Sequence, residues 1–219
     1  AVHAKNGRIF LQVVHPGRAA HSVNDGQQPV SSSANAIEGH KMDTPFNRLH
    51  EKIDFEVPRA LKEEEISEIV QQFADSAKNA MDAGFDGIEI HAANGYLIDQ
   101  FLRDGINKRT DGYGGSIANR VRFLLEITAA VKAVVGADRV GVRISPVNSF
   151  NGGSDSDPEA LTRYIGTELG KLGIAYLHVI RTDFFGVQKG DVEKWARESF
   201  PGVLISNLGY DAETAEAAV

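Results

Sequence analysis

Apolar residues along the chain follow two alternating patterns. In the first, they recur at three- and four-residue spacing, which is typical of amphipathic helices. This pattern covers residues 63–83, 119–135, 158–172 and, over a shorter span, 192–199. In the second, short apolar runs rich in β-branched residues occupy residues 8–15, 88–90, 140–146, 175–180 and 203–207. Runs of this length between helices predict buried parallel strands.

The predicted helices begin and end at residues with known capping preferences. Residues 63–65 are glutamates, which favour the positive end of a helix dipole. Asp157 followed by Pro158 is a start signal, because aspartate caps a helix and proline fits its first position. Glycine follows the predicted helices at positions 84, 136 and 173, and Asp211 begins a last one.

Five strands that alternate with helices imply a parallel sheet with right-handed crossovers. The eight-stranded barrel and the open, doubly wound sheet both have this arrangement. No Gly-x-Gly-x-x-Gly motif follows the first strand, which weakens the dinucleotide-binding form of the open sheet. Each apolar run carries a polar residue inside it or at its end: Gln12, His91, Arg143, His178 and Asn207. In a barrel these residues would converge, so the pattern favours an α/β fold of the TIM-barrel type.

The stretch from Gly84 to Phe101 holds the densest candidate chemistry. His91, Asn94 and Tyr96 lie at or just past the end of a predicted strand, where α/β folds build their active sites. Together they supply two hydrogen-bond donors and a potential acid. The structural alternative is that His91 and Asn94 satisfy buried backbone groups at the strand end.

Two polar connections interrupt the regular pattern, at residues 16–62 and 102–118. The first is rich in Ser, Asn, Gly and Pro, and loops of such length are uncommon unless they are functional or disordered. This connection is either a lid over a site or a flexible loop on the surface, and we favour a lid.

Composition excludes several classes of function. The chain has 219 residues, 42% of them hydrophobic, and a net charge of -7. This is a soluble globular composition without a Lys/Arg block, so we expect no nucleic-acid or membrane partner. The absence of cysteine excludes disulfides and cysteine-ligated metals within these 219 residues, and we expect no metal site. Without an apolar run near the roughly 20 residues of a membrane span, or a signal peptide, the expected location is cytoplasmic.

The ends of the sequence suggest a piece of a longer protein. Residues 1–7 begin without methionine and resemble the last turn of a helix, capped at Asn6 and Gly7. Residues 217–219 stop inside a helical pattern that has hardly begun.

Several segments resemble the Old Yellow Enzyme family, FMN-dependent ene-reductases on a (β/α)8 barrel. The matching segments follow one another at residues 7–12, 15–18, 91–102, 109–120 and 142–146. The third matches the family's His-x-x-Asn-Gly-Tyr-Leu-x-x-Gln-Phe-Leu signature. The pair His91 and Asn94, in place of two histidines, resembles the branch with plant oxophytodienoate reductases and trypanosomatid prostaglandin F synthases.

The resemblance implies a single partial barrel domain over residues 1–219, covering about strands 3 to 7. The remaining strands would hold further contacts to the flavin ring and its phosphate. An isolated chain of this length would expose sheet edges and half a core, so we expect it not to hold FMN or turn over.

Three residues are implied to bind the cofactor. Arg143 would place a positive charge near N1 and O2 of the flavin, and Gln12 would bind the pyrimidine edge of the ring. Gly209 would offer its backbone N–H to the phosphate, whereas Leu208 replaces a glycine that the family usually has in this turn. Alternatively, Arg143 forms an ion pair inside the barrel and Gln12 is a satisfied core amide.

The resemblance also implies catalytic roles. His91 and Asn94 would bind the oxygen of the substrate's electron-withdrawing group, and Tyr96 would protonate the α-carbon, since a phenol is protonated at neutral pH. NADPH or NADH would first reduce the flavin in the same site, giving ping-pong kinetics. Val14 and Phe150 would shape the substrate pocket, although Phe150 could equally be a packing residue.

The expected activity is therefore reduction of activated C=C bonds in α,β-unsaturated carbonyl or nitro compounds. A flavin-free barrel such as an aldolase is less favoured, because no predicted strand ends in lysine. A larger flavoenzyme such as a 2,4-dienoyl-CoA reductase and a non-catalytic barrel remain alternatives. The sequence leaves open the natural substrate, the stereochemistry, the choice of NADPH or NADH, and whether the protein is a monomer or a homodimer.

Overall fold

The computed structural model describes residues 1–39, 41–42, 49 and 52–218. The main sheet consists of β1 (Phe10–Val13), β6 (Gly87–Ala92), β7 (Val140–Ile144), β8 (Tyr176–Ile180) and β9 (Val203–Asn207). The helices that follow one another along this sheet are α2 (Glu63–Asp82), α3 (Leu97–Leu102), α4 (Ile117–Val135), α5 (Pro158–Leu172), α6 (Val192–Ser199) and α7 (Ala212–Ala217). Short 3-10 turns span His3–Lys5, Gly17–Ala19, Ala137–Arg139 and Phe150–Gly152.

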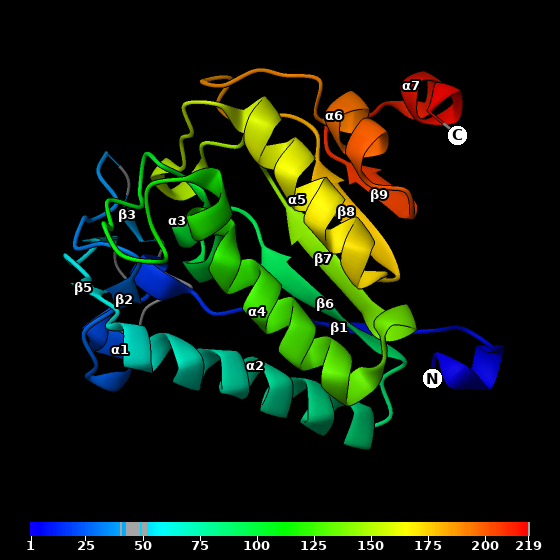
Figure 1. Ribbon diagram of the computed structural model, residues 1–219, viewed down its shortest axis with the longest axis horizontal. Coiled ribbons are helices and arrows are strands. Elements are labelled where there is room, and N and C mark those ends of the chain that lie inside the picture. Colours follow the sequence, from blue (N-terminus) through cyan, green and yellow to red (C-terminus); the bar gives the residue numbers. More distant parts are fainter. Residues whose placement is uncertain (40, 43–48, 50–51, 219) are drawn as a thin grey trace.

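The order of the strands in the sheet decides between the two architectures. The five strands are parallel and lie side by side in chain order, β1-β6-β7-β8-β9. Right-handed crossovers in one direction place all helices on the same face, whereas a doubly wound sheet reverses its order and has helices on both faces. In Figure 1, α2, α4, α5 and α6 cover one face of the sheet. The predicted alternation is confirmed, and its topology is that of a section of a (β/α)8 barrel.

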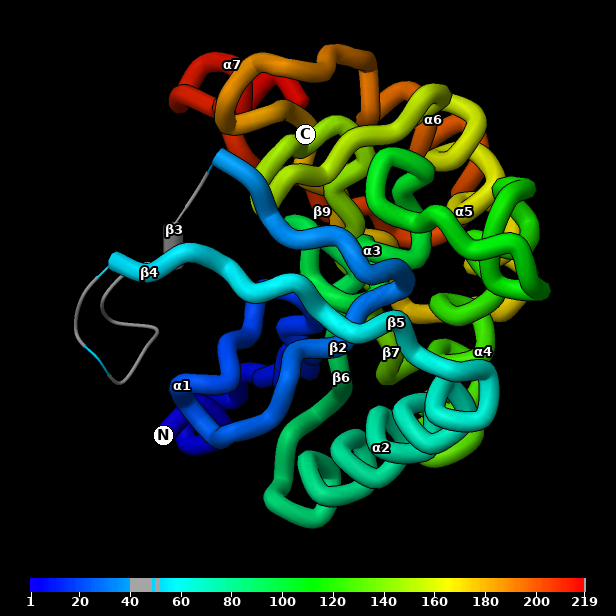
Figure 2. The backbone as a smooth tube through the Cα atoms, turned by 90° about the vertical axis from the view of Figure 1, so that its left-hand side faces the viewer, coloured from blue at the N-terminus to red at the C-terminus, as the bar shows by residue number. Residues whose placement is uncertain are grey.

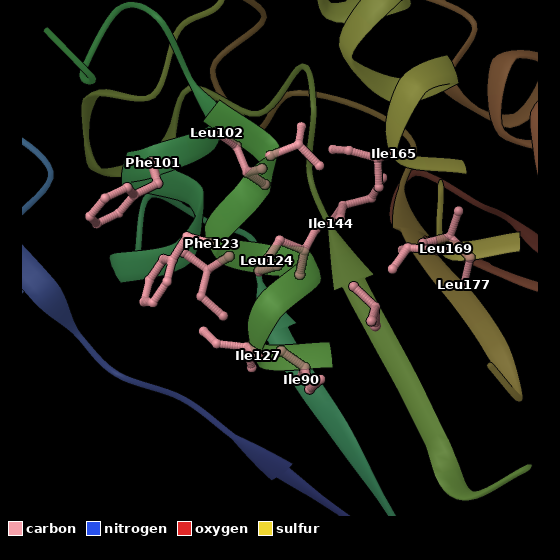
Figure 3. Close-up of a cluster of buried hydrophobic side chains, with 14 of the residues drawn as sticks. Ile90, Phe101, Leu102, Phe123, Leu124, Ile127, Ile144, Ile165, Leu169 and Leu177 are labelled. Atoms are coloured by element: carbon pink, nitrogen blue, oxygen red, sulfur yellow. The ribbon is translucent and has the colours of Figure 1, made fainter. Parts of the chain in front are cut away.

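The face of the sheet under the helices is apolar. Ile88 and Ile90 on β6, and Val142 and Ile144 on β7, are at most 1% exposed. Figure 3 shows Ile90 and Ile144 packed against Leu124 and Ile127 of α4. Burial of a full aliphatic side chain stabilises a fold by about 1.5–3 kcal/mol, so this layer holds the helices in place.

The opposite face of the sheet is polar. Because side chains alternate between faces, the register places Gln12 beside Glu89, and His91 beside Arg143. His178 of β8 is the next neighbour of Arg143. The polar residues singled out within the strands thus share one face, as a barrel interior requires.

Glycines in two strands of the polar face make room for aromatic rings. A Cβ atom at Gly141 would lie 2.1 Å from the Tyr176 ring, and one at Gly87 would lie 2.5 Å from the Phe10 ring. The two rings pack on each other with centroids 5.8 Å apart. Small and large residues therefore alternate across this layer.

We expect Gly141→Ala to destabilise the fold by about 1–3 kcal/mol, because the added methyl overlaps the Tyr176 ring. The matched control is Gly112→Ala, where a Cβ atom meets only an arginine nitrogen at 4.0 Å. Urea unfolding of both variants and of the Gly141→Ala, Tyr176→Leu double variant measures the effect. If the double variant recovers no stability, the clash is not the cause.

The described residues of the 16–62 connection lie across the end of the sheet at which the strands finish (Figures 1 and 2). It contains small elements that the hydrophobic pattern does not predict. These are α1 (Ser22–Asp25), β2 (Val30–Ser31), β3 (Lys41–Met42), β4 (Ile53–Asp54) and β5 (Arg59–Ala60). Residues 40, 43–48, 50 and 51 of the predicted lid lie outside the described residues.

Helix α3 is also absent from the sequence prediction, for a physical reason. All of its residues, Leu97–Leu102, are buried, including Asp99 and Gln100. A short helix that is buried on every side shows no amphipathic period. Its polar residues bind loop backbone: Asp99 accepts from Gly95 N at 2.8 Å, and Gln100 donates to Gly95 O at 2.8 Å.

The described residues lack both a membrane-spanning helix and a cluster of metal ligands. None of their helices is long and apolar enough to cross a membrane. Likewise, the described part of the chain has no group of three or more His, Cys, Asp or Glu residues that could hold a metal ion.

Candidate active site

A cavity of about 1160 Å³ opens at the carboxyl ends of the strands. Its wall combines residues of β1, β6 and β7 with residues of the 16–62 connection. Of the predicted site residues, those that line it are Gln12, Val14, His91, Asn94, Tyr96, Arg143 and Phe150. The connection contributes Pro16, Ala19, Ala20, His21, Asn24, Asp25, Gly39, Lys52 and Phe55. A cavity of this size is large enough for a small-molecule ligand or cofactor.

His91 is a neutral hydrogen-bonding group in this wall. Its side chain is only 4% exposed, and Nδ1 is buried without a hydrogen-bond partner among the described residues. Burial, and then the charge of Arg143, lower the pKa of His91 to about 4. Its ring lies 5.4 Å from the Tyr96 ring. A neutral imidazole with an unpaired buried nitrogen is a site for a polar ligand atom.

Asn94 is held so that its amide donor is available to a ligand. Its backbone has a φ of +59°, a left-handed conformation that asparagine tolerates better than most residues. Its backbone N–H donates to Ser145 Oγ at 2.7 Å, and its Oδ1 accepts from Asn148 Nδ2 at 3.1 Å. Because the carbonyl oxygen is engaged, Nδ2 is the group left for the cavity.

Tyr96 stands at the N-cap position of α3, in extended backbone with φ −82° and ψ 178°. The Asn94-Gly95 turn places it there, since Gly95 also has a positive φ, of +69°. A Cβ atom at Gly95 would lie 2.6 Å from Asn151 Cβ, so a glycine is required for this close approach. The turn brings Tyr96 back to the His91 ring.

Arg143 and Gln12 fit a planar, polar cofactor. Arg143 donates from one terminal nitrogen to Asn207 Oδ1 at 3.4 Å, while its buried Nε has no partner among the described residues. Gln12 donates from Nε2 to Glu89 Oε1 at 2.6 Å, which leaves its carbonyl oxygen as an acceptor. Among the described residues, this cavity wall thus offers an arginine donor without a partner and an amide oxygen that can accept, which matches the donor and acceptor pattern of a flavin pyrimidine ring.

Glu89 is a polar residue of this face that sequence reasoning missed. It accepts hydrogen bonds from Gln12, from Tyr176 Oη at 3.0 Å and from His178 Nδ1 at 3.0 Å. Burial opposes its ionisation, but the hydrogen bonds from His178 and Gln12 outweigh burial and lower its pKa to about 2. The signal was the period-two alternation of Gly87, Glu89 and His91, which places all three on one face.

The rim of the cavity is apolar. Val14 is 48% exposed and Phe150 is 37% exposed, and both line the cavity. Phe150 stacks on Phe185, with ring centroids 6.4 Å apart, and Phe184 lies edge-on to it at 6.2 Å. Phe185 also lines the cavity, and nothing in the sequence pattern marked it.

Gly209 stands apart from this cavity and does not line it. Its backbone has a φ of +74° in the turn after β9, and its carbonyl oxygen accepts from Arg181 at 3.0 Å. Leu208 also has a positive φ, of +81°, so a leucine occupies a conformation that favours glycine. Arg181 and Thr182, which border Gly209, line a second cavity of about 330 Å³.

We expect His91 to remain neutral from pH 8 down to about pH 5, because its pKa is lowered to about 4. In the unfolded chain a histidine titrates near its ordinary pKa of about 6.5. Between about pH 4 and pH 6.5 the unfolded state therefore binds more protons than the folded state. The contribution of neutral His91 to the free energy of unfolding is therefore present above about pH 6.5 and is lost as the pH falls toward about 4. NMR titration of the His91 ring checks this, and a midpoint above pH 6 would contradict it.

The chain is similar to several known proteins, of which three are described here. A probable flavin mononucleotide-dependent alkene reductase of Leishmania infantum is 50% identical, over all of this chain and 60% of that protein. The structure of the old yellow enzyme from Trypanosoma cruzi is 41% identical with a TM-score of 0.92, covering 98% of this chain and 61% of that one. Morphinone reductase, solved in complex with tetrahydroNAD, is 43% identical with a TM-score of 0.89, covering 98% and 59%.

The chain thus spans about 60% of the length of these relatives. The structural match confirms the fold as part of an α/β barrel, and the resemblance to Old Yellow Enzymes is confirmed over the whole chain. Residues 1–201 match the NADH:flavin oxidoreductase / NADH oxidase family. This chain belongs to that family.

Proposed function

We propose that the protein containing this chain is an FMN-dependent ene-reductase. It reduces activated C=C bonds of α,β-unsaturated carbonyl or nitro compounds with NADPH or NADH. The observation that carries the proposal is the meeting of His91, Asn94 and Tyr96 with Arg143 and Gln12 in one cavity. The relatives named as an alkene reductase and an old yellow enzyme support it.

Arg143 and Gln12 are the residues that hold the flavin ring in this proposal. The chemistry that FMN supplies when bound is transfer of a hydride, taken from NADPH or NADH, to an alkene. Arg143 brings a permanent charge, which favours the electron-rich form of the ring. Gln12 orients the pyrimidine edge through its free carbonyl oxygen. Gly209 is proposed to offer its N–H group to the phosphate, on the separate turn after β9.

His91 and Asn94 bind the substrate oxygen in this proposal. Asn94 donates from Nδ2, because its Oδ1 is held by Asn148. His91 donates from a neutral ring, which its lowered pKa maintains at physiological pH. Both groups are fixed before the substrate arrives, so they stabilise the negative charge that develops on that oxygen.

Tyr96 holds a proton at its phenolic oxygen and delivers it to the α-carbon of the alkene. Its position at the N-cap of α3, against His91, keeps it on the same cavity wall as the substrate donors. Val14, Phe150 and Phe185 form the apolar rim that contacts the remainder of the substrate.

We also propose that the described parts of residues 16–62 act as a lid within one barrel domain. Ala19, Ala20, His21 and Asn24 line the cavity from this segment, opposite the strand ends. A cover of this kind excludes water from the reacting groups.

The test is made on the full-length protein that contains this chain. Mass spectrometry of the folded protein measures bound FMN, and product analysis follows reduction of 2-cyclohexenone with NADPH and with NADH. Cyclohexene, which lacks the carbonyl, is the control and should not react. Oxidation of the nicotinamide without any alkene reduction would refute the ene-reductase proposal.

A further inference from the structure

The polar face of the sheet holds a continuous hydrogen-bonded chain that crosses every strand of the sheet. It runs from Gln12 on β1 through Glu89 on β6 to His178 on β8. From there it continues to Asn207 on β9 and returns to Arg143 on β7. Its two ends are the side chains proposed to hold the flavin ring, and its interior members have no place in the mechanism above.

His178 lies between two hydrogen-bond acceptors. Its Nδ1 is 3.0 Å from Glu89 Oε2, and its Nε2 is 3.0 Å from Asn207 Oδ1. The Glu89 carboxylate also accepts hydrogen bonds from Gln12 Nε2 and Tyr176 Oη, which stabilise its ionised form, and an ionised carboxylate only accepts hydrogen bonds. Nδ1 must therefore carry a proton.

The orientation of the Asn207 amide is fixed by a second neighbour. Arg143 has no acceptor, so the group that faces its terminal nitrogen at 3.4 Å must be the amide oxygen. The same oxygen faces His178 Nε2. If the Asn207 amide were flipped, its NH2 group would face the terminal nitrogen of Arg143, and two hydrogen-bond donors would then oppose each other. Nε2 of His178 must therefore carry a proton as well.

We propose that His178 is doubly protonated and forms, with Glu89 and Asn207, a charged brace that positions Gln12 and Arg143. Glu89 fixes the Gln12 amide, so that its carbonyl oxygen faces away from the carboxylate. Asn207 receives hydrogen bonds from both cations, His178 and Arg143, and holds the guanidinium against the cavity wall. Glu89, His178 and Asn207 are positioning residues, since they act through other side chains.

The surrounding charges are consistent with this brace. Several ionisable groups of the described residues lie near His178: Glu89 and His91 on β6, Arg143 on β7 and Tyr176 on β8. The side chains of Glu89 and His178 are 13% and 16% exposed, so water screens the pair only in part. The positive charge of His178, with that of Arg143, also helps to lower the pKa of His91.

The first experiment is 15N NMR of the full-length protein with labelled histidine, in the FMN-free and FMN-loaded states. The sequence has seven histidines, and a His178→Gln variant assigns the signal. At pH 7 we expect both ring nitrogens of His178 to show the shifts of a protonated imidazolium. A neutral ring in the wild-type protein, with one unprotonated nitrogen, would overturn the proposal.

The second experiment compares two changes around Glu89. Glu89→Gln removes the charge and should leave His178 neutral and FMN binding weaker on the order of tenfold, since a hydrogen bond to a charged group is lost. Tyr176→Phe removes one hydrogen bond to Glu89 but leaves Gln12 and His178 in place. It should retain the imidazolium and bind FMN within about twofold of the wild type. Equal effects of the two variants would overturn the positioning role.

The part of this inference that concerns FMN rests on the proposed function, whereas the protonation of His178 does not. A wild-type protein that binds no FMN would refute the proposed function, and the FMN-free spectrum would still decide the brace. An imidazolium that persists in Glu89→Gln would refute the brace alone, whatever the flavin content.

Discussion

Tyr96→Phe should slow reduction of an enone by about 10²–10⁴-fold, because it removes the proposed proton donor and nothing else. The Tyr96 ring lies 5.4 Å from the His91 ring, and the phenyl ring of phenylalanine fills the same space, so the shape of the cavity is kept. Reduction of the flavin by NADPH or NADH needs no proton from Tyr96. We therefore expect that half-reaction to proceed at nearly its original rate.

Stopped-flow absorbance separates the two half-reactions, since each changes the flavin spectrum in the opposite direction. Tyr164→Phe is the matched control, because this tyrosine is in α5, packs against the core and does not line the cavity. It should change neither rate. Equal slowing of both half-reactions by Tyr96→Phe would show that Tyr96 supports the cofactor or the fold rather than donating a proton.

Asp155→Ala should destabilise the protein by about 3–5 kcal/mol, because it leaves a buried arginine without its counter-ion. Asp155 Oδ2 lies 2.6 Å from a terminal nitrogen of Arg120, and the two side chains are 0% and 4% exposed. The carboxylate also accepts from the backbone N–H groups of Asp104 and Asp157, each at 3.0 Å. The alanine variant therefore loses a charge pair and two backbone contacts at once.

Urea unfolding of the full-length protein measures this loss. Glu198→Ala is the matched control, since Glu198 pairs with Arg163 at 2.7 Å but the two side chains are 47% and 35% exposed. Solvent screens such a pair, so the control should cost less than about 1 kcal/mol. A loss of stability for Asp155→Ala no greater than for Glu198→Ala would show that Arg120 finds another partner when the carboxylate is removed.

The ion pair of Asp155 and Arg120 is also connected to the active site, through a shared loop. Ser145 and Asn148, which hold Asn94, lie in the same loop between β7 and α5 as Asp155. Arg103 donates to Ser145 O at 2.8 Å and fixes the start of that loop from the side of α3. Loosening the loop is therefore expected to weaken substrate binding as well as stability.

The sequence by itself determined the features that depend on local patterns. The three- and four-residue spacing and the capping residues predicted α4, α5 and α6 closely, because helix formation depends on neighbours within one or two turns. The short apolar runs predicted the five strands for the same reason. The motifs from His91 to Tyr96 and around Arg143 identified the family, and their positions at strand ends predicted a shared cavity.

Tertiary structure alone decided which of these residues face one another and in what state. Nothing near Glu89 in the chain marks it as the partner of Gln12 and His178, which are 77 and 89 residues away. The orientation of the Asn94 amide depends on Asn148, and the neutrality of His91 depends on burial and on Arg143. Phe185 and the buried helix α3 likewise acquire their roles only through contacts distant in sequence. Protonation and hydrogen-bond direction are set by the surrounding field and by available partners, which exist only after the strands have paired.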